Sequence, residues 1–200
     1  MTNDASSKLG MRPVTQPYGN MRIGYYKADT AQALYRYQPV ALSATGTVKV
    51  AGLADNTPVL GVIVGFLDSN KEALPDSMQD LTAGAYLPAL KAGYVAVTDD
   101  PNQLYLLEED TGGSALTLDA IGNTAVWTYL ATTGNTTTGV ANVVLDRSTI
   151  AADTGGSLQL VALGGETNSD GTHNAVGNNG KWVCRISNHQ FGNQALSVPV

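Results

Sequence analysis

The amino-acid sequence predicts an all-β protein whose core is a sandwich or barrel of jelly-roll type, with an extended N-terminal arm and few short helical turns. Short runs rich in β-branched and aromatic residues recur from Val40 onward. Loops of Gly, Thr, Asn and Asp separate these runs, and the longest are Thr132–Gly139 and Gly164–Gly180. Helical periodicity is weak, so no long amphipathic helix is expected.

Residues 1–39 differ from the rest of the chain because they concentrate tyrosines among glycines and prolines and show no long period. We expect an extended, Tyr-rich arm, in which Asp29 or Thr30 caps a short helix over Ala31–Tyr37. Tyrosine carries a large apolar area with a polar tip, so such an arm suits docking either on another protein or on its own domain. Deletion of residues 1–39 is expected to leave a folded domain.

Residues 40–200 are expected to form a β-rich globular domain, and a division into two sub-domains near residues 111–124 stays open. Two short helical turns are expected, over Asp76–Leu81 and Leu116–Ile121. Seven segments are predicted to be strands: Thr47–Val50, Val59–Phe66, Gly93–Thr98, Leu104–Glu109, Ala125–Leu130, Leu158–Leu163 and Lys181–Ser187.

Two of these strands are expected to pair as a hairpin. Gly93–Thr98 and Leu104–Glu109 flank an Asp-Asp-Pro-Asn sequence, which is typical of a turn. The last strand follows an Asn-Gly turn signal. Its alternation directs Trp182, Cys184 and Ile186 into the core and leaves three polar residues on the outer face: Lys181, Arg185 and Ser187.

The composition argues against several classes of partner. Charged residues make up 14% of the chain, and 11 basic against 17 acidic residues give a net charge of −6. Nucleic acid and anionic membranes both require clustered Lys and Arg, so neither is expected as a partner. Cys184, the single cysteine, has no internal disulfide partner, and the N-terminus lacks a secretory signal. Because the apolar run Pro58–Leu67 is too short to span a bilayer, we expect a soluble chain made in a cytoplasm.

We find no motif for catalysis, cofactor binding or metal binding, and we do not expect an enzyme. The run Gly177–Lys181 looks like half of a P-loop, but Ala175 replaces the first glycine and Trp182 replaces the magnesium-binding hydroxyl. His173 and His189 are the only histidines, and no local cluster supplies the ligands of a zinc site. Acidic residues near positions 99–100 and 108–110 would lie about 16 Å apart along a hairpin, too far for a glycosidase carboxylate pair.

Three segments carry a resemblance to a known group of proteins. Val59–Phe66 is a valine-rich strand, Leu90–Tyr105 contains two strands around an Asp-Pro turn, and Lys181–Gln190 is a Lys-Trp strand that ends in Asn-His-Gln. Together they resemble small structural proteins of tailed bacteriophages that are encoded alongside the major capsid protein. The resemblance covers roughly half of the chain, and it carries over no catalytic residue.

The resemblance implies a capsid decoration, or cement, protein. Such a structural virion protein binds the outside of the icosahedral capsid and bridges major capsid protein subunits. It is assembled in the host cytoplasm, lies on the capsid surface and associates with further copies of itself, as homotrimers or alternatively as dimers. The alternative function is a tail-fibre or carbohydrate- or receptor-binding β module of a phage virion. That alternative calls for exposed tryptophan, whereas Trp127 and Trp182 are predicted to face the core.

Contacts with the capsid or with a neighbouring copy are expected at the tyrosines of the arm and just after the last strand. These residues are Tyr18, Tyr25, Tyr26, Tyr35, Tyr37, Asn188, His189 and Gln190. If the imidazole of His189 donates hydrogen bonds across a subunit contact, protonation near about pH 6.5 should weaken assembly. A histidine satisfied within its own fold would have no such effect on assembly.

Overall fold

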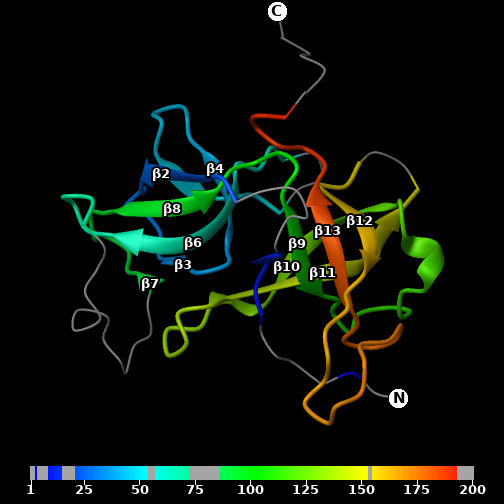
Figure 1. The fold of residues 1–200 in the computed structure, drawn as a ribbon. Coiled ribbons are helices and arrows are strands. Elements are labelled where there is room, and N and C mark those ends of the chain that lie inside the picture. Colours follow the sequence, from blue (N-terminus) through cyan, green and yellow to red (C-terminus); the bar gives the residue numbers. More distant parts are fainter. Residues whose placement is uncertain are drawn as a thin grey trace, which may run out of the picture.

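The computed structural model describes residues 3, 9–14, 21–53, 57–72, 86–152 and 155–192. Within these residues the chain forms thirteen strands and one 3-10 helix, η1, over Leu118–Ala120. The prediction of an all-β fold is confirmed (Figure 1). The strands are β1 (Arg12–Pro13), β2 (Ile23–Lys27), β3 (Leu34–Tyr35), β4 (Pro39–Leu42), β5 (Val48–Val50), β6 (Gly61–Leu67), β7 (Tyr86–Leu87), β8 (Tyr94–Thr98), β9 (Leu104–Glu108), β10 (Thr124–Gly134), β11 (Ala141–Ala151), β12 (Leu158–Leu163) and β13 (Lys181–Ile186).

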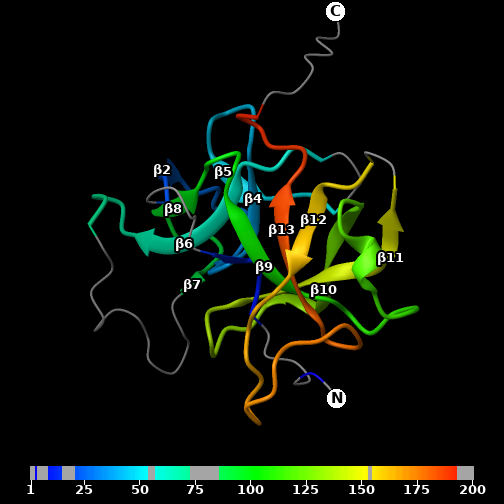
Figure 2. The ribbon, with the colours of Figure 1, turned by 45° about the vertical axis from the view of Figure 1, so that its right-hand side comes forward.

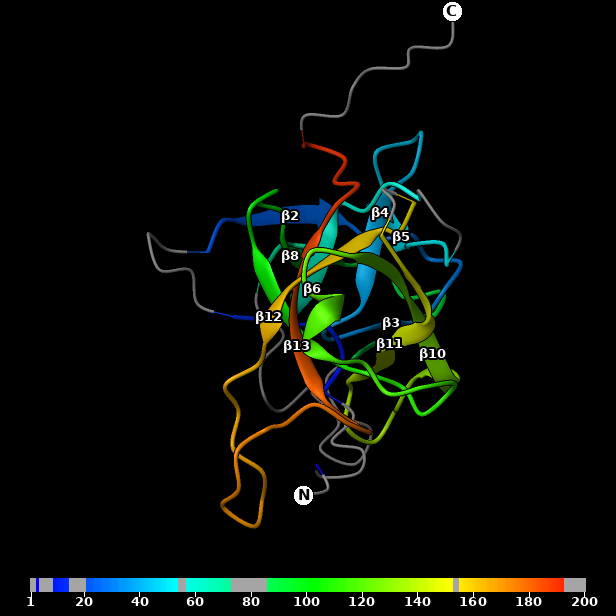
Figure 3. The same ribbon diagram turned by 90° about the vertical axis from the view of Figure 1, so that its right-hand side faces the viewer.

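Two antiparallel sheets form the body of the protein, and a third pairs β3 with β7. The five-stranded sheet has the order β2-β8-β6-β4-β5, and the six-stranded sheet has the order β1-β9-β13-β12-β10-β11. The five-stranded sheet curls until its ends meet, because Ala28, which follows β2, bridges Val48 of β5. The six-stranded sheet closes in a similar way between β9 and β11, because Glu109, which follows β9, bridges Leu145. Figure 3 shows the six-stranded sheet as a ring, with η1 at its near end. Both sheets therefore approach closed barrels, which leaves few free strand edges.

Two hydrophobic cores each lie mostly within one sheet, although Ala41 of β4 and Val62 of β6 pack in the larger core. The larger core lies within the six-stranded sheet and contains both tryptophans, Trp127 and Trp182, which are fully buried. Cys184 and Ile186 are also buried there, so the predicted alternation of β13 toward the core is confirmed. The smaller core lies within the five-stranded sheet and contains Leu34, Val40, Val48, Leu60, Ile63, Phe66, Val95 and Val97.

The predicted hairpin over Gly93–Thr98 and Leu104–Glu109 is wrong, although both strands form. β8 pairs with β2 and β6, whereas β9 pairs with β1 and β13. The turn itself is present, because Asp100 Oδ1 accepts the N–H of Asn102 at 2.8 Å. It carries the chain from one sheet to the other, and Tyr105 Oη donates back to the carbonyl of Thr98 at 3.1 Å.

The predicted helix over Ala31–Tyr37 is also wrong. Asp29 Oδ1 accepts the N–H of Ala31 at 3.0 Å, which makes a turn, and β3 follows. Leu34 packs in the five-stranded core, whereas the next residue, Tyr35, packs against the six-stranded core. Successive side chains that point to opposite faces require a strand, so tertiary packing overrides the capping signal.

The structure contains one of the two predicted helical turns and one strand that was not predicted. The turn predicted over Leu116–Ile121 is confirmed by η1, and the turn predicted over Asp76–Leu81 lies outside the described residues. Strand β11 is not among the predicted strands, although it forms a long hairpin with β10. No helix among the described residues is long and apolar enough to cross a membrane.

The described part of residues 1–39 belongs to the sheets rather than to a separate arm. β1 pairs with β9, β2 with β8 and β3 with β7, and β4 begins at Pro39. The described part of residues 1–39 therefore packs on its own chain, which is one of the two possibilities that the sequence left open. The two cores lie mostly in different sheets, and residues 116 and 120, within the expected boundary at 111–124, are buried in the larger core.

Candidate functional site

The structure separates the predicted contact tyrosines into buried and exposed side chains. Tyr35 is buried and stacks on Tyr86 with 5.3 Å between ring centroids. Tyr37 is half-buried against the larger core, and Tyr26 is half-buried in β2. Tyr25, by contrast, is 60% exposed. Position 18 lies outside the described residues.

Tyr26 is held by contacts within its own sheet. Its hydroxyl donates to Asp99 Oδ2 at 2.5 Å, and Arg22 Nε lies 3.0 Å from Asp99 Oδ1. Burial, followed by the hydrogen bond to Asp99, raises the pKa of Tyr26 to about 12. The guanidinium of Arg22 also lies 5.8 Å from the ring centroid of Phe191. This cluster fixes the start of β2 against β8 and the C-terminal segment.

The predicted contact residues after β13 are bound to their own chain. The N–H of Val59 donates to the carbonyl of Asn188 at 2.9 Å, and the N–H of Gln190 donates to the carbonyl of Val59 at 2.8 Å. The side chain of Gln190 accepts from the N–H of Leu42 at 2.7 Å. The segment therefore joins the five-stranded sheet to the end of β13.

His189 is buried between these two hydrogen-bonding neighbours. Its Nδ1 accepts the N–H of Phe191 at 3.0 Å, so this nitrogen carries no proton in the folded structure. Burial lowers the pKa of His189, and the nearby carboxylates of Asp99 and Asp100 oppose that effect. The imidazole thus faces its own fold, as the simpler of the two sequence interpretations expects.

The outer face of β2 presents an apolar stripe. Met21, Ile23 and Tyr25 are 39%, 41% and 60% exposed. Ile23 and Tyr25 alternate in β2 with half-buried Gly24 and Tyr26, and Met21 lies two residues before the strand. We call these three residues the β2 stripe. Exposed apolar side chains that gather along one strand and its approach form a candidate protein-binding surface.

The backbone beside the β2 stripe has an open edge. The N–H of Ala28 donates toward β8, to the carbonyl of Gly93, whereas the N–H of the next residue, Asp29, donates the opposite way, to Val48. Alternation along the strand therefore directs the N–H and C=O groups of residues 23, 25 and 27 away from β8. Across residues 23–27, no strand in the described part of the chain pairs with this outer edge.

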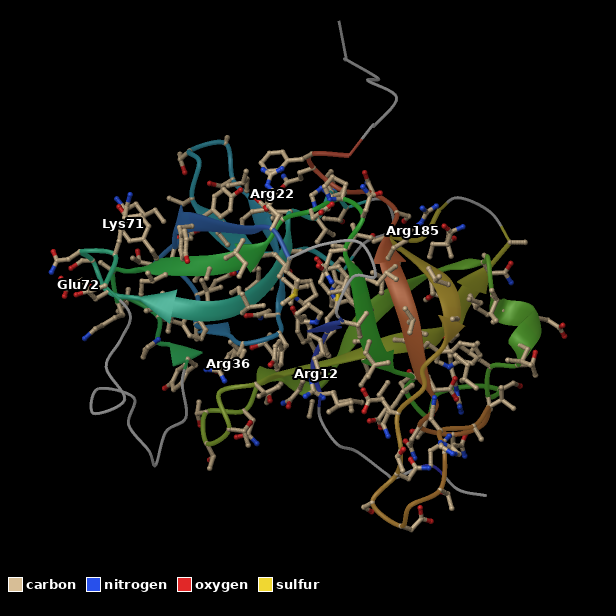
Figure 4. All side chains as sticks on the ribbon, in the orientation of Figure 1. Arg12, Arg22, Arg36, Lys71, Glu72 and Arg185 are labelled. Carbon is tan, nitrogen blue, oxygen red and sulfur yellow. The ribbon has the colours of Figure 1, made fainter. Side chains whose placement is uncertain are left out.

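Basic side chains flank the stripe in a chain of net charge −6. Arg22 lies at the start of β2 and is 59% exposed, and exposed Lys27 ends the strand. Lys71 Nζ lies 5.1 Å from the ring centroid of Tyr94, the cross-strand neighbour of Lys27. Figure 4 shows Arg22 at the start of β2 and Lys71 at the left-hand end of the molecule. The edge therefore suits a partner surface with acidic groups.

The buried carboxylate of Glu109, which follows β9, is bound by the chain itself. Trp182 Nε1 donates to Glu109 Oε2 at 3.0 Å, and the N–H of Leu116 donates to the same oxygen at 3.4 Å. Burial raises the pKa of Glu109, and these hydrogen bonds and Arg147 oppose the rise. Such a network stabilises the fold and leaves no polar group of Glu109 directed at a ligand.

Metal binding and thiol chemistry find little support in the side chains. Among the described residues, no three His, Cys, Asp or Glu side chains gather closely enough to hold a metal ion. Cys184 is fully buried, and burial raises its pKa to about 12, which disfavours the reactive thiolate.

Comparisons with protein-family models, with curated proteins and with solved structures found no match. The candidate site therefore depends on the geometry of the β2 stripe alone. The sequence interpretation included Tyr25 but missed Met21 and Ile23. The alternation over residues 21–27 is the signal that could have found them, because it places all three on one face of a strand.

Proposed function

We propose that the chain is a structural virion protein that binds the outside of an icosahedral phage capsid and stabilises it by bridging major capsid protein subunits. The observation that carries this proposal is the β2 stripe on an open strand edge. The segmental resemblance to phage structural proteins supplies the class of partner. The edge supplies a surface that can bind protein without any catalytic or cofactor chemistry.

The open edge supports binding by strand addition. Outward N–H and C=O groups of residues 23, 25 and 27 can pair with an extended segment of the capsid protein, as one more strand of the five-stranded sheet. Met21, Ile23 and Tyr25 then bury apolar area against that segment, and Lys27 attracts acidic groups beside it. Five residues of β2 provide a modest interface for each copy. Association of copies as homotrimers or dimers multiplies such weak contacts on one shell.

The proposal is tested by a shell-binding assay with purified capsids and purified protein. Tyr25→Ser removes the most exposed member of the stripe, and we expect at least about a tenfold loss of affinity, since central interface tyrosines often contribute more than 1–2 kcal/mol. Leu118→Ser is the matched control, because Leu118 is 57% exposed but lies in η1, at the other end of the molecule in Figure 1. Equal binding by both variants and the original chain would contradict the proposed surface.

The number of copies in purified virions tests the class of function. Quantitative mass spectrometry against the major capsid protein is expected to give an abundance comparable to that protein. A few copies per particle would instead indicate the alternative, a tail-fibre or receptor-binding module. Absence from virions would reject both virion functions.

A further inference from the structure

Lys181 is buried in β13, although the alternation along this strand predicts an exposed side chain. Its register puts the side chain on the outer face of the sheet, opposite to Trp182, yet the residue is only 4% exposed. The loop over residues 164–180 joins β12 to β13 (Figure 2) and contacts this side chain. Lys181 Nζ donates to Asn168 Oδ1 of this loop at 3.3 Å, and Asn168 is buried as well.

The carboxamide of Asn168 is fixed with its oxygen toward the lysine. Its Nδ2 donates to Thr172 Oγ1 at 3.0 Å and to the carbonyl of His173 at 3.4 Å, so Oδ1 is the atom that faces Nζ. Asp170 Oδ1 in turn accepts the N–H of Thr172 at 2.9 Å, which holds this turn. Because a C=O bond is about 1.2 Å long, the amine nitrogen lies within about 4.5 Å of the carboxamide carbon.

A buried carboxyl group lies beside this pair. Glu108 is the direct cross-strand neighbour of Lys181 in the ladder between β9 and β13, and it too is buried. Directly opposite residues have Cβ atoms about 5 Å apart on the same face of a sheet. The fold thus holds an amine and a carboxamide in hydrogen-bond contact, and a buried carboxyl group occupies the neighbouring position on the same face of the sheet.

We propose that Lys181 and Asn168 form an intramolecular isopeptide bond, with Glu108 as the proton-transfer group. Glu108 takes a proton from the ammonium, and the free amine attacks the carboxamide carbon of Asn168. The bond from this carbon to Nδ2 then breaks as the new bond to Nζ forms. The leaving nitrogen takes one proton from Nζ and departs as ammonia, while Glu108 keeps the proton that it took and ends neutral. The step consumes no oxidant, reductant or other co-reactant.

The physical gain is the removal of a buried charge. An ammonium group that is shielded from water and bound to a neutral amide is costly, whereas the amide product is neutral and keeps a hydrogen-bonding N–H. The bond also closes the loop between residues 168 and 181 covalently, which ties it to β13 and slows unfolding. This inference is independent of the proposed shell binding, since it concerns only groups within one chain.

Intact-mass spectrometry of the full chain tests the bond. The expected mass is about 17 Da below the sequence mass, because one ammonia is lost. Proteolysis should then give a branched peptide that links residues 168 and 181. Lys181→Arg and Glu108→Gln are each expected to restore the full sequence mass. Lys91→Arg is the matched control, since Lys91 is exposed, and it should keep the mass deficit.

One side reaction gives the same mass change. A succinimide at Asn179-Gly180 also loses ammonia, but hydroxylamine cleaves it and leaves an isopeptide bond intact. A chain that keeps the full sequence mass after prolonged incubation at pH 8 would overturn the proposal. A mass deficit that hydroxylamine treatment assigns to Asn179, or that persists in Lys181→Arg, would also overturn it.

Discussion

Arg147 and Glu109 form a buried ion pair where the six-stranded sheet closes on itself, with 3.2 Å between Nη1 and Oε1. The same guanidinium donates to the carbonyls of Gly112 and Gly113 at 2.7 and 2.6 Å, and to Asn178 Oδ1 at 2.9 Å. One side chain of β11 therefore binds the loop after β9 and the turn before β13. The Arg147 guanidinium can therefore be buried, because Glu109 balances its charge and three oxygen atoms accept its hydrogen bonds.

The first prediction concerns this ion pair. Arg147→Ala should lower the free energy of unfolding by about 3–5 kcal/mol, because it leaves the buried carboxylate of Glu109 without its cation. Urea denaturation followed by tryptophan fluorescence measures the change. Arg185→Ala is the control, since exposed Arg185 makes one contact of 2.8 Å, with Gln159, and should cost less than about 1 kcal/mol. Similar losses in both variants would contradict the role assigned to Arg147.

The second prediction concerns a glycine that touches an aromatic ring. A Cβ at Gly134 would lie 2.3 Å from the ring of Tyr35, which is itself buried and stacked. Gly134→Ala should therefore destabilise the protein by about 1–3 kcal/mol through overpacking. Gly165→Ala has open space around its Cβ and should be nearly neutral. Thermal unfolding of the two variants checks the difference, and equal melting temperatures would refute the predicted clash.

The third prediction is a dependence of stability on pH. Burial lowers the pKa of His189 below its usual 6.5, whereas the unfolded chain keeps the usual value. As the pH falls below 6.5, the unfolded state therefore binds more protons than the folded state. The free energy of unfolding is largest above pH 6.5, declines as the pH falls, and levels off below the pKa of the folded state. The charged groups around the imidazole are Asp99, Asp100 and Arg22.

Urea denaturation at several values from pH 8 to pH 5 measures this dependence. His189→Gln should flatten the curve over that range, although it also lowers stability at every pH. His173→Gln is the control, because His173 is exposed and should leave the curve unchanged. A curve of the original chain that is already flat over that range would contradict the prediction.

Periodicity predicted those parts of the fold in which each strand has one buried face. In β13, Trp182, Cys184 and Ile186 alternate with Val183 and Arg185, and the structure buries the first three as expected. The turn at Asp100 was also readable, but local turn chemistry does not specify whether the flanking strands pair. β11 was missed because Asp146 and Arg147 interrupt its apolar run, and only the tertiary contact with Glu109 shows why an arginine is buried there.

The candidate site was harder to predict than the fold. Tyr25 and Tyr26 are neighbours in sequence, yet one is exposed and the other donates to Asp99. Which of two successive side chains faces outward depends on the sheet that the strand joins, and composition cannot supply that information. The predicted set of contact tyrosines therefore mixed structural residues with one residue of the β2 stripe.

The fourth prediction revises the expected effect of deleting residues 1–39. Deletion removes β1, β2 and β3, together with buried Leu34 and Tyr35, so the truncated chain should not fold cooperatively. Circular dichroism during thermal denaturation distinguishes the outcomes, since a cooperative transition near that of the full chain would contradict this expectation. Loss of shell binding on deletion is thus no test of the β2 stripe, whereas point variants on its exposed side are.

The fifth prediction separates backbone pairing from side-chain contact at the open edge. Ile23 directs its N–H away from β8, so proline at this position removes an outward donor without breaking the ladder between β2 and β8. Ile23→Ala removes the same apolar side chain but keeps the N–H. If the capsid protein adds a strand, Ile23→Pro should bind shells about 2–10 times more weakly than Ile23→Ala, the effect of one hydrogen bond. Circular dichroism first establishes that both variants keep the fold. Equal binding by the two variants would reject strand addition and leave the stripe as a contact made by side chains alone.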